Sequence, residues 1–209
     1  SGKTTLISLI PRFYDVRQGE VLVDGVDVKE YPFSQLRGMI GIVPQKAVLF
    51  KGTIRHNMQW RDKNATDEDI WNALDIAQAK DFVEKKPDKL DEMILQEGKN
   101  LSGGQRQRLT IARALVGDPE ILILDDSASA LDLATDARLR KAIHEKTSGM
   151  TVFIVSQRIS SIKSADKIIV LDDGKIAGIG THSELYKGCE VYKEICLSQL
   201  SEKEAQANG

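Results

Sequence analysis

The residues most able to do chemistry lie in two short stretches near the middle of the chain. In residues 101–105 small side chains precede a basic, helix-like stretch, and Asp125 and Asp126 directly follow the apolar run 121–124. Small residues at the start of a helix leave backbone N–H groups open to an anion, and carboxylates at the end of a strand suit magnesium. The pattern predicts a site that binds phosphate and magnesium, as in a protein that uses a nucleotide. The predicted phosphate-binding residues of the first stretch are Ser102, Gly103, Gly104 and Gln105.

The first residues of the chain match the end of the phosphate-binding loop G-x-x-x-x-G-K-[ST]. In such a loop Lys3 would reach the β- and γ-phosphates, and the Thr4 hydroxyl would ligate magnesium. The leading glycine and the strand before the loop are absent, so we expect a fragment whose first helix runs to about Ile10. Taken alone, these residues are equally consistent with an ordinary helix start. The predicted nucleotide-binding residues are Ser1, Gly2, Lys3, Thr4 and Thr5.

Hydrophobic periodicity predicts strands that alternate with helices, which indicates an α/β fold with a parallel sheet. Residues 52–116 are predicted to form a helical sub-domain inserted between strands, in which Thr66 and Asp69 cap a helix. We expect one domain over residues 1–200 and a frayed polar tail over residues 201–209. The predicted strands after the first helix include residues 40–43, 121–124, 151–155, 167–171 and 175–179.

Gln45 follows the predicted strand 40–43. The ligand-binding groups of α/β sheets lie beyond the carboxyl ends of their strands. A neutral amide at such a place can contact the magnesium shell and an attacking water without adding charge. The alternative is a loop glutamine that is hydrogen bonded to backbone, and for an isolated glutamine this is the better interpretation.

The charge balance argues against a nucleic-acid partner. The chain has 29 Lys and Arg residues and 31 Asp and Glu residues, so its net charge is -2. No apolar run approaches the roughly 18 residues of a membrane-spanning helix. Cys189 and Cys196 lie two helical turns apart in a helix-like segment, too distant for an easy disulfide, so we expect free thiols. These features predict a soluble, cytosol-facing globular chain.

The order of these motifs resembles the nucleotide-binding domain of an ABC transporter, a P-loop NTPase, over nearly the whole chain. The resemblance implies ATP and Mg²⁺ as ligands, with Thr4, Gln45 and Asp125 on the metal and Asp132 in the nucleotide site. It also implies that the fold is the P-loop, RecA-like core with its first strands missing. The matching motifs are the end of the Walker A loop at residues 2–4, the Q-loop at Gln45, the signature at 101–105, Walker B at 121–125, the D-loop ending at Asp132, and the switch position at Gln157.

Three further stretches resemble the exporter type of this family, in which transmembrane helices are fused ahead of the domain. They are residues 49–54, Asn57 and residues 180–185. The resemblance therefore implies a fused transmembrane domain outside the present sequence, and a position at the cytoplasmic face of the cell membrane. A soluble ABC-type ATPase that acts on DNA or ribosomes and the stand-alone ATPase subunit of an importer are alternatives.

Two residues depart from the family pattern. Asp126 stands where the family has a glutamate that polarises the attacking water, and it is one methylene shorter. Gln157 stands where the family has a histidine, and it can donate a hydrogen bond but cannot become cationic. Proton transfer and transition-state stabilisation both demand exact geometry and charge. With Gln45, these are the candidate catalytic residues, and we expect a site that binds ATP and hydrolyses it slowly.

The resemblance also implies a head-to-tail dimer, in which the signature of one domain completes the ATP site of the other. The signature at residues 101–105 is intact, whereas the site around Asp126 and Gln157 departs from the pattern. We therefore expect a non-identical partner domain, with hydrolysis at the partner's site, and an isolated fragment that is inactive. A homodimeric exporter with active sites is the alternative.

Overall fold

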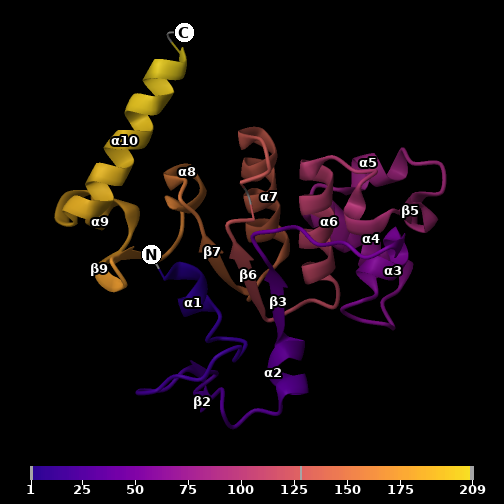
Figure 1. Cartoon of the computed structure of the whole chain (residues 1–209), viewed down its shortest axis with the longest axis horizontal. Coiled ribbons are helices and arrows are strands. Elements are labelled where there is room, and N and C mark those ends of the chain that lie inside the picture. Colours follow the sequence, from indigo (N-terminus) through magenta and orange to yellow (C-terminus); the bar gives the residue numbers. More distant parts are fainter. Residues whose placement is uncertain (1, 128, 208–209) are drawn as a thin grey trace.

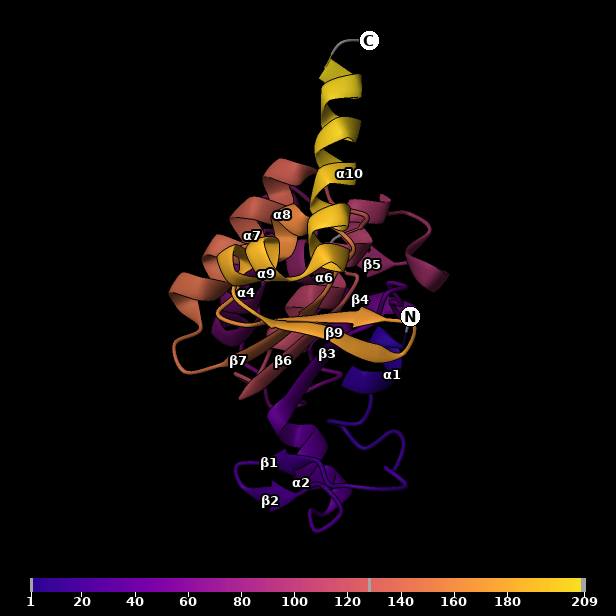
Figure 2. The ribbon, with the colours of Figure 1, turned by 90° about the vertical axis from the view of Figure 1, so that its left-hand side faces the viewer.

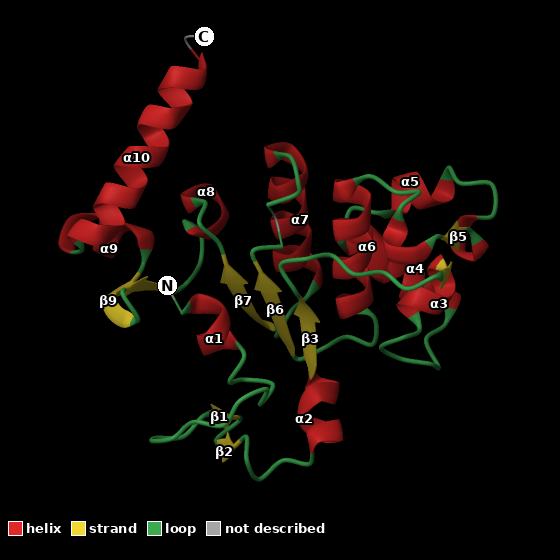
Figure 3. Ribbon diagram, in the orientation of Figure 1, coloured by secondary structure: helices red, strands yellow, loops and turns green. Residues whose placement is uncertain are grey.

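A three-stranded parallel sheet forms the centre of the molecule (Figure 3). The computed structural model describes residues 2–127 and 129–207, and the predicted site residue Ser1 lies outside them. The strands are β3 (Ile40–Val43), β6 (Ile121–Asp125) and β7 (Thr151–Val155), in the order β3-β6-β7. Ile40 pairs with Ile121, and Ile121 pairs with Thr151, so all three strands end at the same edge. The predicted α/β fold with a parallel sheet is confirmed.

Alternate residues of β6 face opposite layers of the molecule. Leu122 and Leu124 are buried in one hydrophobic cluster, whereas Ile123 is buried in another together with Leu36 and Ile40. A strand buried on both faces reads as a continuous apolar run, which is why residues 121–124 show no polar alternation. In Figure 2 helix α7 (Leu133–Lys146) lies above the strands, and α2 (Phe33–Met39) lies below them.

The chain between β3 and β6 is mainly helical and shares the hydrophobic cluster on one face of the sheet. The Arg61 guanidinium joins it to the sheet, because it donates to the carbonyl oxygens of Val116 at 2.7 Å, Ile40 at 2.8 Å and Gly38 at 2.8 Å. The elements are β4 (Gly52–Thr53), α3 (Ile54–Met58), α4 (Asp67–Ile76), α5 (Lys80–Glu84), η1 (Lys89–Asp91), β5 (Met93–Ile94), η2 (Gln96–Gly98) and α6 (Gly103–Leu115).

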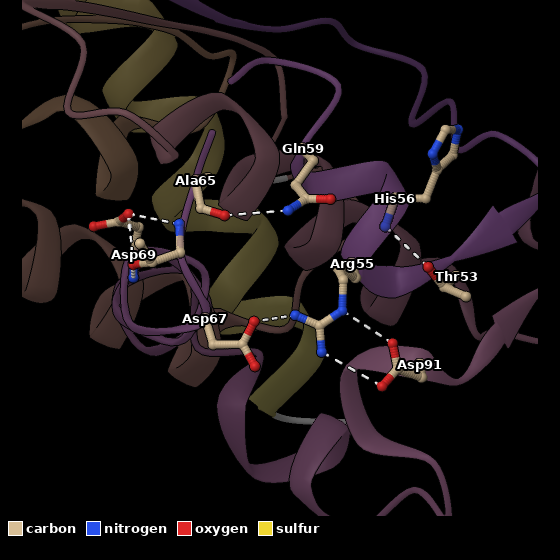
Figure 4. Close-up of polar contacts among 9 residues, drawn as sticks. Thr53, Arg55, His56, Gln59, Ala65, Asp67, Asp69 and Asp91 are labelled. Atoms are coloured by element: carbon tan, nitrogen blue, oxygen red, sulfur yellow. Dashed lines mark hydrogen bonds and ion pairs between the residues drawn. The ribbon is translucent and has the colours of Figure 1, made fainter. Parts of the chain in front are cut away.

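Arg55 holds three of these elements together (Figure 4). Its guanidinium donates to Asp91 Oδ1 at 2.9 Å and also pairs with Asp67 at the start of α4. The hydrogen bonds from Arg55 lower the pKa of the Asp91 carboxyl below its usual value. The predicted capping pair at α4 is confirmed, since Thr66 N–H donates to Asp69 Oδ2 at 2.8 Å and Asp69 N–H donates to Thr66 Oγ1 at 3.2 Å.

The two ends of the described chain carry small antiparallel hairpins rather than further parallel strands. Near the start, α1 (Lys3–Ile7) precedes the β1 (Leu22–Val23) and β2 (Val26–Asp27) pair, and it ends before the predicted limit at Ile10. Residues 167–171 and 175–179 were predicted as strands, and they form a hairpin that is separate from the central sheet. The last elements are α8 (Ile159–Ile162), β8 (Ile168–Asp172), β9 (Lys175–Gly180), α9 (His182–Gly188) and α10 (Glu190–Ala207).

Helix α10 extends away from the body of the molecule (Figure 1). It continues to Ala207 and so includes most of residues 201–209, for which fraying stays a prediction. Cys189 and Cys196 are both free and buried in the cluster between α9, α10 and the β8-β9 hairpin, as expected for unpaired thiols. Among the described helices, none combines the length and apolarity needed to cross a membrane.

Candidate functional site

A cavity of about 210 Å³ opens beyond the carboxyl ends of the parallel strands. This is where α/β sheets bind their ligands, because the loops that leave the strands converge there. Ten described residues from four separate stretches of chain line it, and the sequence predicted eight of them as site residues. The predicted ones are Gly2, Lys3, Thr4, Thr5, Gln45, Asp125, Asp126 and Gln157; Val155 and Ser156 complete the lining.

Helix α1 begins at the edge of this cavity. Its N-cap residue Gly2 has φ 111° and ψ 0°, a left-handed conformation that favours glycine. A Cβ at Gly2 would meet no atom within 4 Å. Glycine is therefore favoured here by the backbone conformation and not by a lack of space for a side chain. Lys3, Thr4 and Thr5 follow in the first turn and line the cavity. The first turn of α1 therefore brings Lys3, Thr4 and Thr5 to one cavity.

Two of the three predicted metal ligands, Thr4 and Asp125, are in direct contact. The Thr4 hydroxyl donates to Asp125 Oδ1 at 3.2 Å, and Asp125 is the last residue of β6. Asp125 is buried, with 8% of its surface exposed. The contact places a hydroxyl and a carboxylate oxygen side by side.

Asp126 directly follows β6 and turns the chain sharply. It has φ 46°, a left-handed conformation that aspartate tolerates better than most residues, and its N–H donates to the Val155 carbonyl at 2.9 Å. Its carbonyl accepts from the Ser129 hydroxyl at 2.9 Å. Gln45 Nε2 donates to Asp126 Oδ2 at 3.4 Å. The side chain of Gln45 is thus directed at a carboxylate and not at backbone, in contrast to the simpler interpretation of an isolated glutamine.

Gln157 lies in the loop between β7 and α8, which forms another wall of the cavity. The Arg158 N–H donates to Ser156 Oγ at 3.0 Å. The Arg158 guanidinium reaches the carbonyl oxygens of Leu131 at 3.3 Å and Ser129 at 3.2 Å. The loop that carries Gln157 is therefore tied to the chain just ahead of Asp132.

The predicted signature residues do not line this cavity. Ser102 is the N-cap of α6, and Gln105 N–H donates to Ser102 Oγ at 3.2 Å while Ser102 N–H donates to Gln105 Oε1 at 3.0 Å. This reciprocal pair is a capping box, and it commits the Gln105 side chain to the helix start. Gly103 and Gly104 form the first turn of the 13-residue helix. The predicted phosphate-binding residues thus form two separate groups within this chain.

Asp132 is also outside the residues that line the cavity. It is the N-cap of α7: Thr135 N–H donates to Asp132 Oδ1 at 2.9 Å, and the Thr135 hydroxyl donates to Oδ2 at 2.7 Å. These hydrogen bonds to the ionised form lower the pKa of the Asp132 carboxyl. The structure therefore gives this residue a helix-capping role.

Three residues at this site were not among the predicted site residues. Val155, the last residue of β7, and Ser156 directly precede Gln157, so proximity in sequence could have identified them. Gln199 contacts the backbone of the same loop from α10, and no local pattern connects residues 42 positions apart.

The cavity provides few of the ligands that a metal ion needs. Among the described residues, no group of three or more His, Cys, Asp or Glu side chains could hold a metal by itself. Magnesium commonly takes one or two protein ligands and completes its shell with phosphate oxygens and water. The Thr4 hydroxyl and the Asp125 carboxylate fit that kind of site, in which the nucleotide supplies the other ligands.

Comparison with known proteins places this architecture in one family. The model of the ABC transporter family matches residues 1–129. An uncharacterized ABC transporter ATP-binding protein of Mycobacterium tuberculosis is 46% identical over 202 residues, which cover 95% of this chain and 34% of that protein. The ABC transporter B family member 21 of Arabidopsis thaliana is 41% identical over 99% of this chain and 16% of that protein.

A solved structure shows the same fold. The structure of a bacterial Atm1-family ABC exporter with ATP bound superposes with a TM-score of 0.90 at 36% identity, and covers 95% of this chain and 35% of that chain. The present chain thus spans about a third of the bacterial proteins that it matches. The family match over residues 1–129, the 46% identity to an ABC transporter ATP-binding protein and the shared fold together show that this chain belongs to the ABC transporter family.

Proposed function

We propose that this chain is the ATP-binding and ATP-hydrolysing domain of an ABC exporter. The observation that carries the proposal is the convergence of Lys3, Thr4, Gln45 and Asp125 on one cavity at the carboxyl edge of the parallel sheet. The similarity of the fold to a bacterial Atm1-family ABC exporter with ATP bound supports the same ligand here. We propose one domain over residues 1–200, with residues 52–116 as its helical sub-domain.

In this proposal the residues around the cavity have separate roles in binding ATP and Mg²⁺. The Lys3 ammonium neutralises phosphate charge, and the N–H groups of the first turn of α1 face the phosphates. Thr4 and Asp125 hold the metal directly or through water, with Gln45 at its edge. Magnesium supplies charge neutralisation on the phosphate oxygens.

Hydrolysis at this cavity is proposed to be slow. Asp126 lines the cavity, but its carboxylate is one methylene shorter than that of the family's glutamate. Gln157 can donate a hydrogen bond to a phosphate yet cannot supply the positive charge that an imidazolium would. A misplacement of about 1 Å can cost about 10²-fold in rate. Together, the two differences favour a site that binds ATP and hydrolyses it slowly.

The signature is proposed to serve a second, non-identical ABC domain. Ser102, Gly103 and Gly104 begin α6 and do not line the chain's own cavity. A head-to-tail pair would place this helix start against the partner's nucleotide, and the present cavity against the partner's signature. In this arrangement the partner's site hydrolyses ATP and this chain's site holds it. The pair would work at the cytoplasmic face of the cell membrane beneath a fused transmembrane domain.

The test is ATP turnover by the complete transporter purified with its partner. Replacing Asp126 by Glu and Gln157 by His together should change total turnover only modestly, because most hydrolysis occurs at the partner's site. Replacing Ser102 by Asp should nearly abolish turnover, because a carboxylate would then face the partner's phosphates. Unchanged turnover in the Ser102→Asp protein would contradict the proposal. Robust turnover by this subunit without a partner would favour a homodimeric exporter.

A further inference from the structure

Helix α10 contacts the loop that carries Gln157. The Gln199 side chain does two things at once: its amide nitrogen donates to the Gln157 carbonyl oxygen, and its Oε1 accepts from Ile159 N–H at 2.9 Å. Gln199 is partly buried, and α10 lies next to α8 in both ribbon views (Figures 1 and 2). One side chain is thus hydrogen bonded to the backbone at both residue 157 and residue 159.

The contact with Gln199 supplies a hydrogen-bond acceptor for the first N–H group of α8. Ile159 is the first residue of α8, and Arg158, its N-cap, makes no side-chain capping bond. The first N–H groups of a helix need acceptors from outside the helix. A primary amide is the neutral side-chain group that can donate and accept together, so glutamine fits both partners. Gln199 therefore caps α8 from a helix about 40 residues further along the chain.

Gln199 is presented from a firmly anchored part of α10. Tyr192, Cys196 and Gln199 are spaced by four and three residues, which places them on one face of the helix. Tyr192 is 1% exposed and Cys196 is 5% exposed, and both belong to the cluster with β8 and α9. The Tyr192 hydroxyl also lies 2.8 Å from His182 Nδ1. The anchoring leaves Gln199 one turn beyond the buried cluster and directed at the loop.

The opposite side of the loop is held as well. The Arg158 guanidinium donates to the carbonyl oxygens of Ser129 and Leu131, ahead of α7. Within α8, the Ser161 hydroxyl donates to the buried Asp136 carboxylate of α7 at 3.0 Å. The loop is thus joined to α7 on one side, and Gln199 joins it to the C-terminal helix on the other.

We propose that Gln199 is a positioning residue, which holds the backbone of Gln157 so that the Gln157 side chain faces the terminal phosphate of ATP. The inference rests on the proposed function, because Gln157 needs a phosphate to contact. It also makes α10 an element on which the nucleotide preference of the site depends. Since only the terminal phosphate would sense Gln157, loss of Gln199 should weaken ATP binding and leave ADP binding unchanged.

The experiment compares Gln199→Met with Glu194→Met in the complete transporter with its partner. Methionine matches glutamine in length but makes neither hydrogen bond, and Glu194 is an exposed residue of the same helix. Photolabelling of this subunit by 8-azido-ATP, competed with ATP or ADP in the presence of magnesium, reports the affinity for each nucleotide. We expect the ATP concentration for half competition to rise about tenfold in Gln199→Met, with ADP unchanged and Glu194→Met like wild type.

Hydrogen exchange without nucleotide gives a second readout that does not depend on ATP binding. In Gln199→Met the amides of residues 157–161 should exchange about tenfold faster, whereas peptides from β6 should be unaffected. Equal losses of ATP and ADP affinity, or unchanged ATP affinity with either exchange result, would overturn the inference. A wild-type subunit that 8-azido-ATP does not label would instead overturn the proposed function.

Discussion

Thr4 and Asp125 meet at the carboxyl edge of the sheet, where the threonine hydroxyl donates to Oδ1 of the aspartate at 3.2 Å although 121 positions separate them. The contact joins the first turn of α1 to the end of the central strand β6. It therefore links the element proposed to bind phosphate to the element proposed to bind magnesium. Any ion held by one of these residues lies within reach of the other.

Replacing Thr4 by Val should weaken magnesium-dependent ATP binding about tenfold, because valine has the same shape but no oxygen for the metal. Replacing Thr4 by Ser keeps the hydroxyl and should restore binding to near the wild-type level. The measurement is 8-azido-ATP labelling of this subunit at a series of magnesium concentrations. Equal loss in the valine and serine proteins would show that the methyl group, rather than the hydroxyl, matters.

Ser102 allows its capping role to be separated from its proposed contact with the partner's ATP. Replacing Ser102 by Ala should lower the free energy of unfolding by about 1 kcal/mol, because the capping box of α6 is lost. Replacing it by Asp should preserve the cap, since aspartate caps helices as well as serine does. Thermal unfolding should therefore show a loss for Ala and little change for Asp. A destabilised aspartate protein would mean that its loss of ATP turnover cannot be assigned to the partner site.

Gly41 marks a place where β3 and the end of α6 approach each other too closely for any side chain. A Cβ there would lie 2.3 Å from the Ala114 carbonyl oxygen. Replacing Gly41 by Ala should lower the free energy of unfolding by about 1–3 kcal/mol, because the strand or helix must shift. Gly38 is the matched control: it lies in α2 and a Cβ would meet nothing within 4 Å. Alanine at Gly38 should be neutral or slightly stabilising in the same unfolding measurement.

The ion pairs of Arg55 predict an acid-sensitive contribution to stability. Hydrogen bonds from Arg55 place the pKa of Asp91 in the folded protein below the ordinary value of 3.8. A carboxyl whose pKa is lower in the folded state stabilises it above the ordinary value, and this contribution disappears as the pH falls through the folded-state pKa. The melting temperature should therefore fall less between about pH 7 and about pH 3 in Arg55→Met than in wild type.

The control for that comparison is Lys63→Met, which removes an exposed positive charge nearby in the sequence. It should follow the wild-type dependence on pH. An Arg55→Met protein whose melting temperature falls as steeply as that of wild type would show that the Asp91 contact contributes nothing in solution. Because Asp91 is on the surface, we also expect added salt to reduce the difference.

Local patterns in the sequence identified much of the fold. The three sheet strands were predicted from their apolar runs, since a strand buried on both faces needs no polar alternation. The capping box of Thr66 and Asp69 was predicted from spacing alone, because its two hydrogen bonds span only three residues. Such features are decided within a few residues, and neighbouring side chains carry all the information that they need.

The sequence also indicated which residues gather at the cavity. Lys3, Gln45, Asp125 and Gln157 lie in motifs whose spacing resembles one family, and the structure brings all four to the same cavity. Their individual roles stay proposals. The family resemblance implied that Ser102 serves a partner's site, whereas no local pattern showed that Asp132 lies outside the cavity, since it caps a helix whose direction depends on packing.

Only the tertiary structure decided how the walls of the cavity are held. The contact of Gln199 with the Gln157 loop depends on where α10 packs against the β8-β9 hairpin, and the β8-β9 pairing outside the central sheet depends on which edges are free to pair. Sequence by itself determined the elements and the motif residues, because hydrogen bonds and hydrophobic periodicity within an element are local. The approach of Thr4 to Asp125 and of Gln199 to Gln157 required the packed core, because burial of the hydrophobic clusters sets the distances between elements.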